Sequence, residues 1–208
     1  SDSDLRHQVN GYWIFQLPFG RDRALAGNAS RGLDAVIGGW QFGGTTRWTS
    51  GFAASVFEGY VWPTNWDEMG WADLTGQPIG NGTTRGNGAN GIPAGTVNVF
   101  KNPDCVSTSG APCGARAAFG YAYPGESGVR NPVRGDGFTS TDMNLSKRWK
   151  ITEGQNFELR WSVFNAFNNV KFDVFTMQDE WDVPTTFGNY TQTLTQPRRM
   201  EFAGIYRF

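Results

Sequence analysis

Residues 137–168 read GFTSTDMNLSKRWKITEGQNFELRWSVFNAFN and contain the clearest structural signal in the chain. Apolar and polar residues alternate from Thr141 to Trp149 and again from Asn156 to Phe167, the period of a β-strand with two unlike faces. The tetrapeptide TEGQ at 152–155 lies between them and is typical of a tight hairpin turn. The stretch therefore predicts two antiparallel strands, 138–150 and 156–167, joined by a short turn.

The same alternation extends outward from this hairpin to three further segments, 5–17, 36–57 and 195–208. One side of most of these segments is rich in Phe and Trp, and the other side is polar. We therefore expect an all-β fold, an antiparallel meander of about five long strands within a single partial β-barrel domain spanning 1–208. Residues 58–137 include a Gly-, Asn- and Thr-rich run and predict one long, irregular loop.

The charge balance and the shortage of reactive side chains exclude several classes of function. The chain has 208 residues with 18 Lys+Arg and 19 Asp+Glu, and this net charge of −1 lacks the basic excess of a nucleic-acid-binding protein. The single histidine, His7, lies in an alternating strand, and no phosphate-binding loop or metal-ligand spacing is present. We expect no nucleic-acid partner, no cofactor, no metal site and no enzymatic activity.

The two cysteines, Cys105 and Cys113, lie close together in a stretch rich in Pro, Ser and Gly. This spacing fits a small disulfide formed in an oxidising compartment, and two free thiols are the alternative.

The fold depends on what covers the apolar faces of the strands. A strand of about ten residues rises roughly 33 Å and, tilted by about 45°, crosses an apolar band of about 25 Å. Longer and shorter connections alternate along the chain, as in a membrane barrel, and aromatic residues lie near the strand ends, as in interfacial girdles. The alternative is a soluble antiparallel sheet, in particular a secreted β-sandwich that binds carbohydrate through tryptophan side chains.

Several stretches with a recognisable order and spacing extend over nearly all five strands. They are residues 4–20, 38–56 and 137–168, the motif FNAFN at 164–168, the motif PRRMEF at 197–202, and an alternating segment that closes on Phe208. Together they resemble the C-terminal β-barrel segment of TonB-dependent outer-membrane receptors. The closest subgroup carries a carboxypeptidase-regulatory-like N-terminal domain. The resemblance implies that Phe202, Tyr206 and Phe208 form the signal for insertion by the barrel-assembly machinery.

The resemblance also implies a place in the cell and a set of partners. The family barrel has about 22 strands and a plugged lumen, so this chain is expected to be a fragment lacking the N-terminal plug and the rest of the barrel. We expect the protein to lie in the outer membrane of a Gram-negative bacterium and to contact its lipid. We expect the TonB complex to supply its energy. The implied function is uptake of a siderophore, carbohydrate or peptide. A truncated barrel piece with no role of its own is the other alternative.

An aromatic cluster precedes the Gly-rich run and is the best candidate for ligand contact: Tyr60, Trp62, Trp66 and Trp71. In an external loop these rings would stack on a sugar or an apolar ligand. The alternative is that they form the small core of the loop itself.

Charged residues on the polar sides of the strands are expected to face the lumen of the barrel: Arg47, Arg148, Glu158 and Arg160. They would line the transport path, or they would form an ion-pair ladder that holds neighbouring strands in register.

Overall fold

The computed structural model describes residues 4–59, 70–86, 93–103, 111–123 and 125–208. These residues form two compact units. The strand unit consists of residues 8–48, 139–170 and 195–208, and the loop unit consists of residues 1–7, 49–138 and 171–194. We describe each unit by itself.

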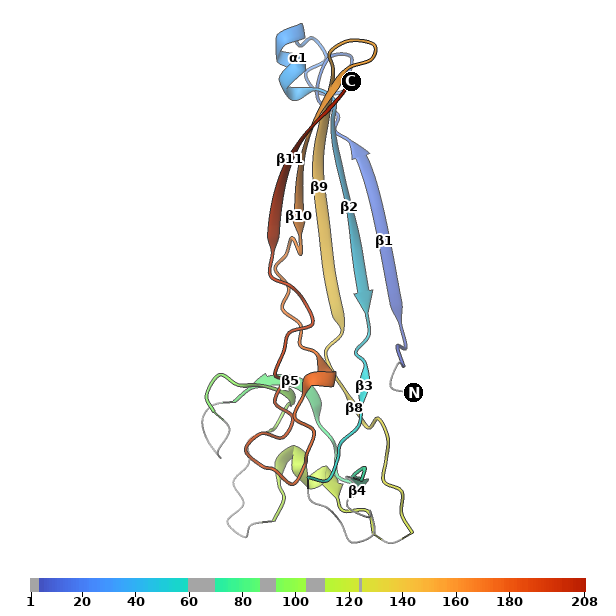
Figure 1. The fold of residues 1–208 in the computed structure, drawn as a ribbon, viewed down its shortest axis with the longest axis vertical. Coiled ribbons are helices and arrows are strands. Elements are labelled where there is room, and N and C mark those ends of the chain that lie inside the picture. The colour runs from blue at the N-terminus through green and yellow to red at the C-terminus, as the bar shows by residue number, and fades with distance from the viewer. Residues whose placement is uncertain (1–3, 60–69, 87–92, 104–110, 124) are drawn as a thin grey trace. The chain divides into compact units, whose positions relative to one another are not determined.

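The strand unit is built on one antiparallel sheet of five long strands, which lie side by side in Figure 1. Their order, β1-β2-β9-β10-β11, follows the chain, and they occupy Gln8–Gln16, Trp40–Thr49, Phe138–Lys150, Asn156–Phe164 and Arg199–Arg207. The all-β antiparallel meander predicted from the alternation is therefore confirmed.

The register of β9, β10 and β11 separates the sheet into two chemically distinct faces. Trp161 on β10 pairs with Leu145 on β9 and with Phe202 on β11. The next residue along β10 points to the other side, where Ser162 pairs with Asn144 and Glu201. We call these sides the apolar face and the polar face.

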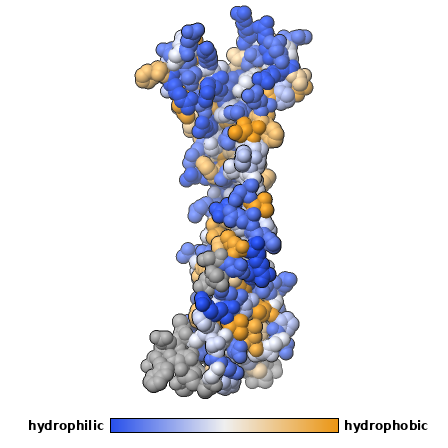
Figure 2. All heavy atoms as spheres, turned by 90° about the vertical axis from the view of Figure 1, so that its right-hand side faces the viewer, coloured by the Kyte–Doolittle hydropathy of each residue, from blue (hydrophilic) through white to orange (hydrophobic). Residues whose placement is uncertain are grey.

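Large side chains of the apolar face stay open to their surroundings. Leu159, Trp161 and Phe202 keep 36%, 37% and 74% of their surface exposed. Figure 2 shows hydrophobic residues at the molecular surface in patches beside hydrophilic ones. A sheet packed against a second protein layer buries such rings, whereas a sheet that meets lipid leaves them uncovered.

Two connections lie at the end of the sheet where the chain terminates (Figure 1). The backbone amides of Ile151 and Thr152 close the β9–β10 turn by donating to the carbonyl oxygen of Gln155, at 2.9 and 3.2 Å. The β1–β2 connection contains a helix that the alternation did not predict, α1 (Arg31–Ile37), capped by the hydroxyl of Ser30. The long connections after β2 and after β10 lead from the opposite end of the sheet.

Among its described residues, the loop unit contains three short antiparallel strand pairs and two short 3-10 helices. The pairs are β3 (Ala53–Ala54) with β8 (Val133–Arg134), β4 (Asp73–Leu74) with β7 (Phe119–Gly120), and β5 (Asn81–Arg85) with β6 (Val97–Phe100). The 3-10 helices are η2 (Gly114–Ala118) and η3 (Val174–Thr176).

A hydrophobic core holds these short elements together. The ring of Phe100 is fully buried, with its centroid 4.9 Å from that of Phe187 and 6.2 Å from that of Phe119. Within the core, the side-chain amide of Asn98 donates to the carbonyl oxygen of Phe187 and to Oδ1 of Asn189 at 2.7 and 2.9 Å. The long loop expected at 58–137 thus packs around a hydrophobic core that it shares with residues of the β10–β11 connection. The composition of the Gly-rich run did not indicate this, because the core rings come from distant segments.

Among the residues that the structure describes, no helix is both long and apolar enough to cross a membrane.

Candidate functional site

The polar face of the sheet carries a cluster of charged side chains centred on Glu158. The carboxylate of Glu158 accepts from Arg160 at 2.6 Å, from Arg148 at 3.1 Å and from Arg207 at 3.0 Å. These arginines come from β10 itself and from both neighbouring strands, β9 and β11. The side chain of Glu158 is only 5% exposed, whereas each arginine is about half exposed.

This arrangement has the geometry of an ion-pair ladder, because one carboxylate links three adjacent strands. Sequence reasoning singled out Arg148, Glu158 and Arg160, and the structure brings all three together. It adds Arg207, which the sequence did not assign to this site. The β10–β11 register explains why Arg207 joins the cluster. It pairs Arg207 with Asn156, which lies two positions before Glu158 and points to the same face. Arg47 lies on β2 and is exposed, outside the Glu158 cluster.

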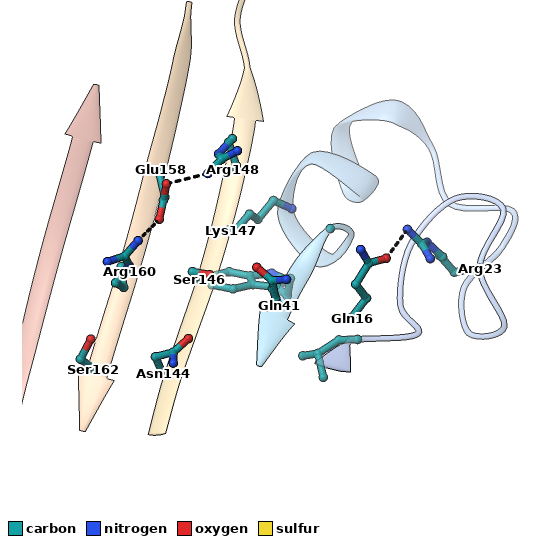
Figure 3. Close-up of a pocket in the computed structure, with 13 residues that line it drawn as sticks. Gln16, Arg23, Gln41, Asn144, Ser146, Lys147, Arg148, Glu158, Arg160 and Ser162 are labelled. Carbon is teal, nitrogen blue, oxygen red and sulfur yellow. Dashed lines mark hydrogen bonds and ion pairs between the residues drawn. The ribbon is translucent and has the colours of Figure 1, made fainter. Parts of the chain in front are cut away.

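The cluster borders an open cavity of about 510 Å³ on the strand unit (Figure 3). Its walls are predominantly polar and include Gln16 and Arg23, whose side chains are joined by a hydrogen bond of 3.3 Å. Three arginines around one glutamate leave a local excess of two positive charges. Such a surface attracts anionic groups and is compatible with water, and it offers no nucleophile paired with a base.

One basic residue, Lys147, interrupts the apolar face, and sequence reasoning did not recognise its role. The β9–β10 register pairs Lys147 with Leu159, yet the residue is 4% exposed. Its ammonium donates to the carbonyl oxygens of Gly38 and Asp34, at the C-terminal end of α1. It also lies 5.7 Å from the ring centre of Trp40 and 5.2 Å from that of Trp149, within cation–π range.

The two tryptophans also hold this end of the helix. The indole N–H of Trp149 donates to the carbonyl oxygen of Ala35 at 2.7 Å, and that of Trp40 donates to Val36 at 2.9 Å. The last carbonyl oxygens of a helix have no partner within the helix. Here they are satisfied by side chains of β2 and β9, which fixes α1 to the sheet.

A second cavity, of about 370 Å³, lies in the loop unit and is lined in part by Trp71. The guanidinium of Arg130 lies 4.5 Å from the ring centre of Trp71, and Phe57, Met177 and Asp179 complete part of the wall. An aromatic ring, a cation and a carboxylate around one hollow can hold a ligand with both apolar and polar groups. The other three members of the predicted aromatic cluster, Tyr60, Trp62 and Trp66, lie outside the described residues.

Burial shifts the pKa values of several groups in the loop unit, including Asp179 and Tyr190. Burial raises the pKa of Asp179 above its ordinary value, and the neighbouring charge of Glu180 acts in the same direction. Burial also raises the pKa of Tyr190 to about 12. Asp179 lies in the wall of the loop cavity, and its surroundings oppose the ionisation of its carboxyl group.

The aromatic residues of the C-terminal strand share the apolar face. Phe202 stacks on Trp161 with ring planes 1° apart and centroids at 5.8 Å. The rings of Tyr206 and Phe208 stack at 6.2 Å, and Phe208 is 96% exposed. The three residues of the predicted insertion signal therefore form an exposed aromatic row.

The predicted disulfide stays a prediction, because Cys105 lies outside the described residues. Within the described ranges, no group of three or more His, Cys, Asp or Glu side chains is arranged to hold a metal ion.

Comparison with known proteins gives one match at the level of a family. The model described as an outer membrane beta barrel domain matches residues 1–201, nearly the whole chain. No curated protein and no solved structure matches this sequence.

Proposed function

The chain belongs to the outer membrane beta barrel domain family, and from this premise we propose that it forms the C-terminal wall of a TonB-dependent transporter. The observation that carries the proposal is the division of the sheet into an exposed aromatic face and a polar face with its own charged cluster. In a barrel wall the first face meets lipid and the second faces the lumen. Family membership does not fit the alternative of a secreted soluble β-sandwich.

The orientation in the membrane follows from the connections. Outer-membrane barrels have short periplasmic turns and long extracellular loops. The β9–β10 turn and the C-terminus therefore mark the periplasmic end, and the long connections after β2 and after β10 are the extracellular loops. The Glu158 cluster, close to the β9–β10 turn, then lies on the lumen wall towards the periplasm.

The resemblance of the strand sequences to TonB-dependent receptors supports the assignment to a TonB-dependent transporter. In this proposal the loop cavity beside Trp71 captures a ligand, with stacking on the ring and polar contacts to Arg130 and Asp179. A siderophore, a carbohydrate or a peptide each has the mixture of apolar and polar groups that these side chains recognise. The role includes no catalytic step and requires no cofactor.

The proposal requires several partners. β1 and β11 are the outer strands of the described sheet, and about eight strands is the practical minimum for a closed membrane barrel. Further strands and a plug from the same chain would close and fill the barrel. The barrel-assembly machinery would read the C-terminal aromatic row, and the TonB complex would supply the energy.

Binding of TonB to the full-length protein tests the proposal. The full-length protein, purified in detergent and placed in phospholipid vesicles, is mixed with the purified periplasmic domain of TonB from the same organism. We expect saturable binding, and we expect it to disappear when the segment upstream of the barrel is removed. Correct insertion without any binding of TonB would refute the transporter assignment while leaving the barrel intact.

A further inference from the structure

We propose that α1 is an interfacial helix that lies in the headgroup layer of the periplasmic leaflet, with Leu33 and Val36 in contact with phospholipid. This inference rests on membership of the outer-membrane barrel family and does not depend on the TonB assignment. It adds a lipid-binding surface outside the strands.

Three side chains of the sheet, Trp40, Lys147 and Trp149, tether α1 and determine the side of the wall on which it lies. Lys147 and Trp149 belong to the apolar face of β9, since they pair with Leu159 and Phe157 of β10. Trp40 packs edge-on against Trp149, with ring centroids at 6.4 Å. All three side chains donate to carbonyl oxygens at the C-terminal end of α1. Because the tethers leave the sheet on its lipid-facing side, the helix lies beside the outer rim of the barrel.

The depth of α1 follows from the same residues. Trp40 and Trp149 lie at the ends of their strands, and tryptophan concentrates at the boundary between hydrocarbon and headgroups. The buried ammonium of Lys147 extends from the apolar face to the backbone of the helix instead of remaining among acyl chains. The C-terminal end of α1 is thus level with the boundary between hydrocarbon and headgroups that Trp40 and Trp149 mark.

The helix presents an apolar side that the described residues leave uncovered. Leu33 is 50% exposed and Val36 is 64% exposed, and their spacing of three residues places them on one side of the helix. Arg31 and Asp34 lie on the opposite side, and a carboxylate oxygen of Asp34 accepts from the amide of Arg21 at 2.6 Å. The apolar side continues the lipid-facing surface of the wall, so a phospholipid is its occupant.

The backbone around α1 makes the position rigid. The Asp34 carboxylate occupies the space beside Gly20 and Gly38, where an added Cβ would lie 2.5 and 2.2 Å from Oδ1. A surface helix of seven residues is marginal on its own. The side-chain tethers therefore account for its order and hold Leu33 and Val36 in one place.

Site-specific photo-crosslinking in the full-length protein tests the proposal. A benzophenone amino acid replaces Val36 in one variant and Ala35 in a matched control, since Ala35 is also exposed but lies on the polar side. Both proteins are inserted into vesicles of phosphatidylethanolamine and phosphatidylglycerol, and the heat-dependent shift in gel mobility confirms folding. After irradiation, mass spectrometry measures the fraction of protein that carries a phospholipid adduct.

We expect at least a fivefold larger adduct fraction at position 36 than at position 35. Equal adduct at both positions, or crosslinks from position 36 to protein alone, would overturn the proposal. If the Val36 variant does not insert, Leu33 serves as the second reporter on the same side, and the same ratio decides the outcome.

Discussion

Arg160 donates from its guanidinium to Glu158 at 2.6 Å, although the two residues are only two positions apart on the same strand. Residues with this spacing point to the same face of a sheet. The pair therefore lies on the polar face, where Arg148 and Arg207 approach the same carboxylate from the neighbouring strands.

Replacing Glu158 by Gln should destabilise the strand unit, because three arginines lose the carboxylate that they share. The expected loss is about 1–3 kcal/mol, the range for a buried hydrogen-bonded charge whose partners are partly exposed. Chemical denaturation of the full-length protein in vesicles measures it. The control is Glu201→Gln, because the Arg199–Glu201 pair is mostly exposed and worth less than about 1 kcal/mol. Equal losses in both variants would contradict the ladder.

Replacing Trp161 by Arg should hinder insertion into the membrane. The residue lies on the apolar face against Phe202, and an arginine facing lipid near the midplane costs about 2–4 kcal/mol. Its neighbour Ser162 faces the other way, opposite Glu201, so Ser162→Arg should be tolerated. The folded fraction in vesicles, measured by gel mobility, compares the two. Similar insertion of both variants would argue against lipid on the aromatic side.

Replacing Phe100 by Ala should loosen the loop unit without disturbing the strands. Phe100 is fully buried against Phe119 and Phe187, and truncation of such a ring costs about 3–5 kcal/mol. Hydrogen exchange of residues 93–103 should accelerate, while exchange in β9 and β10 stays unchanged. Phe175, which is 55% exposed, gives the control for loss of an aromatic ring at the surface. Unchanged protection in the Phe100 variant would show that the loop unit has no cooperative core.

The Asp179 carboxyl should make the loop unit less stable as the pH rises. Its pKa is raised in the folded protein, so the neutral acid is favoured there and stability is lost as the pH passes through the raised pKa. The variant Asp179→Asn cannot ionise and should be more protected from hydrogen exchange than the parent at pH 7. The difference should vanish below the ordinary pKa of the acid, 3.8. A pH-independent difference would mean that the substitution acts through packing.

Much of the strand unit could be predicted from local pattern. The period of two fixes which residues share a face, so Trp161 and Glu158 fall on opposite sides before any partner strand is known. The short turn at 152–155 brings β9 and β10 together, and their facing pairs follow from it. The polar sides of the strands indicated Arg47, Arg148, Glu158 and Arg160 as one group, and the structure brings the last three together while Arg47 lies outside the cluster.

The helix α1 and the role of Lys147 could not be predicted in this way. Seven residues are too few for a clear helical period, and α1 is held by side chains from two strands. Lys147 breaks the apolar pattern of β9, and only the folded chain shows the carbonyl oxygens that it reaches.

The sequence by itself determined the antiparallel meander, the two faces of its strands and an outer-membrane barrel, because the alternation and the motifs are properties of neighbouring residues. The tertiary structure alone decided that Arg207 joins Glu158, that Phe100, Phe119 and Phe187 meet in one core, and that Lys147 and two tryptophans fix a helix to the sheet. These contacts join residues far apart in the chain, and register and loop closure set them. Neither the register of the strands nor the closure of the loops is encoded in a local pattern of hydrophobicity.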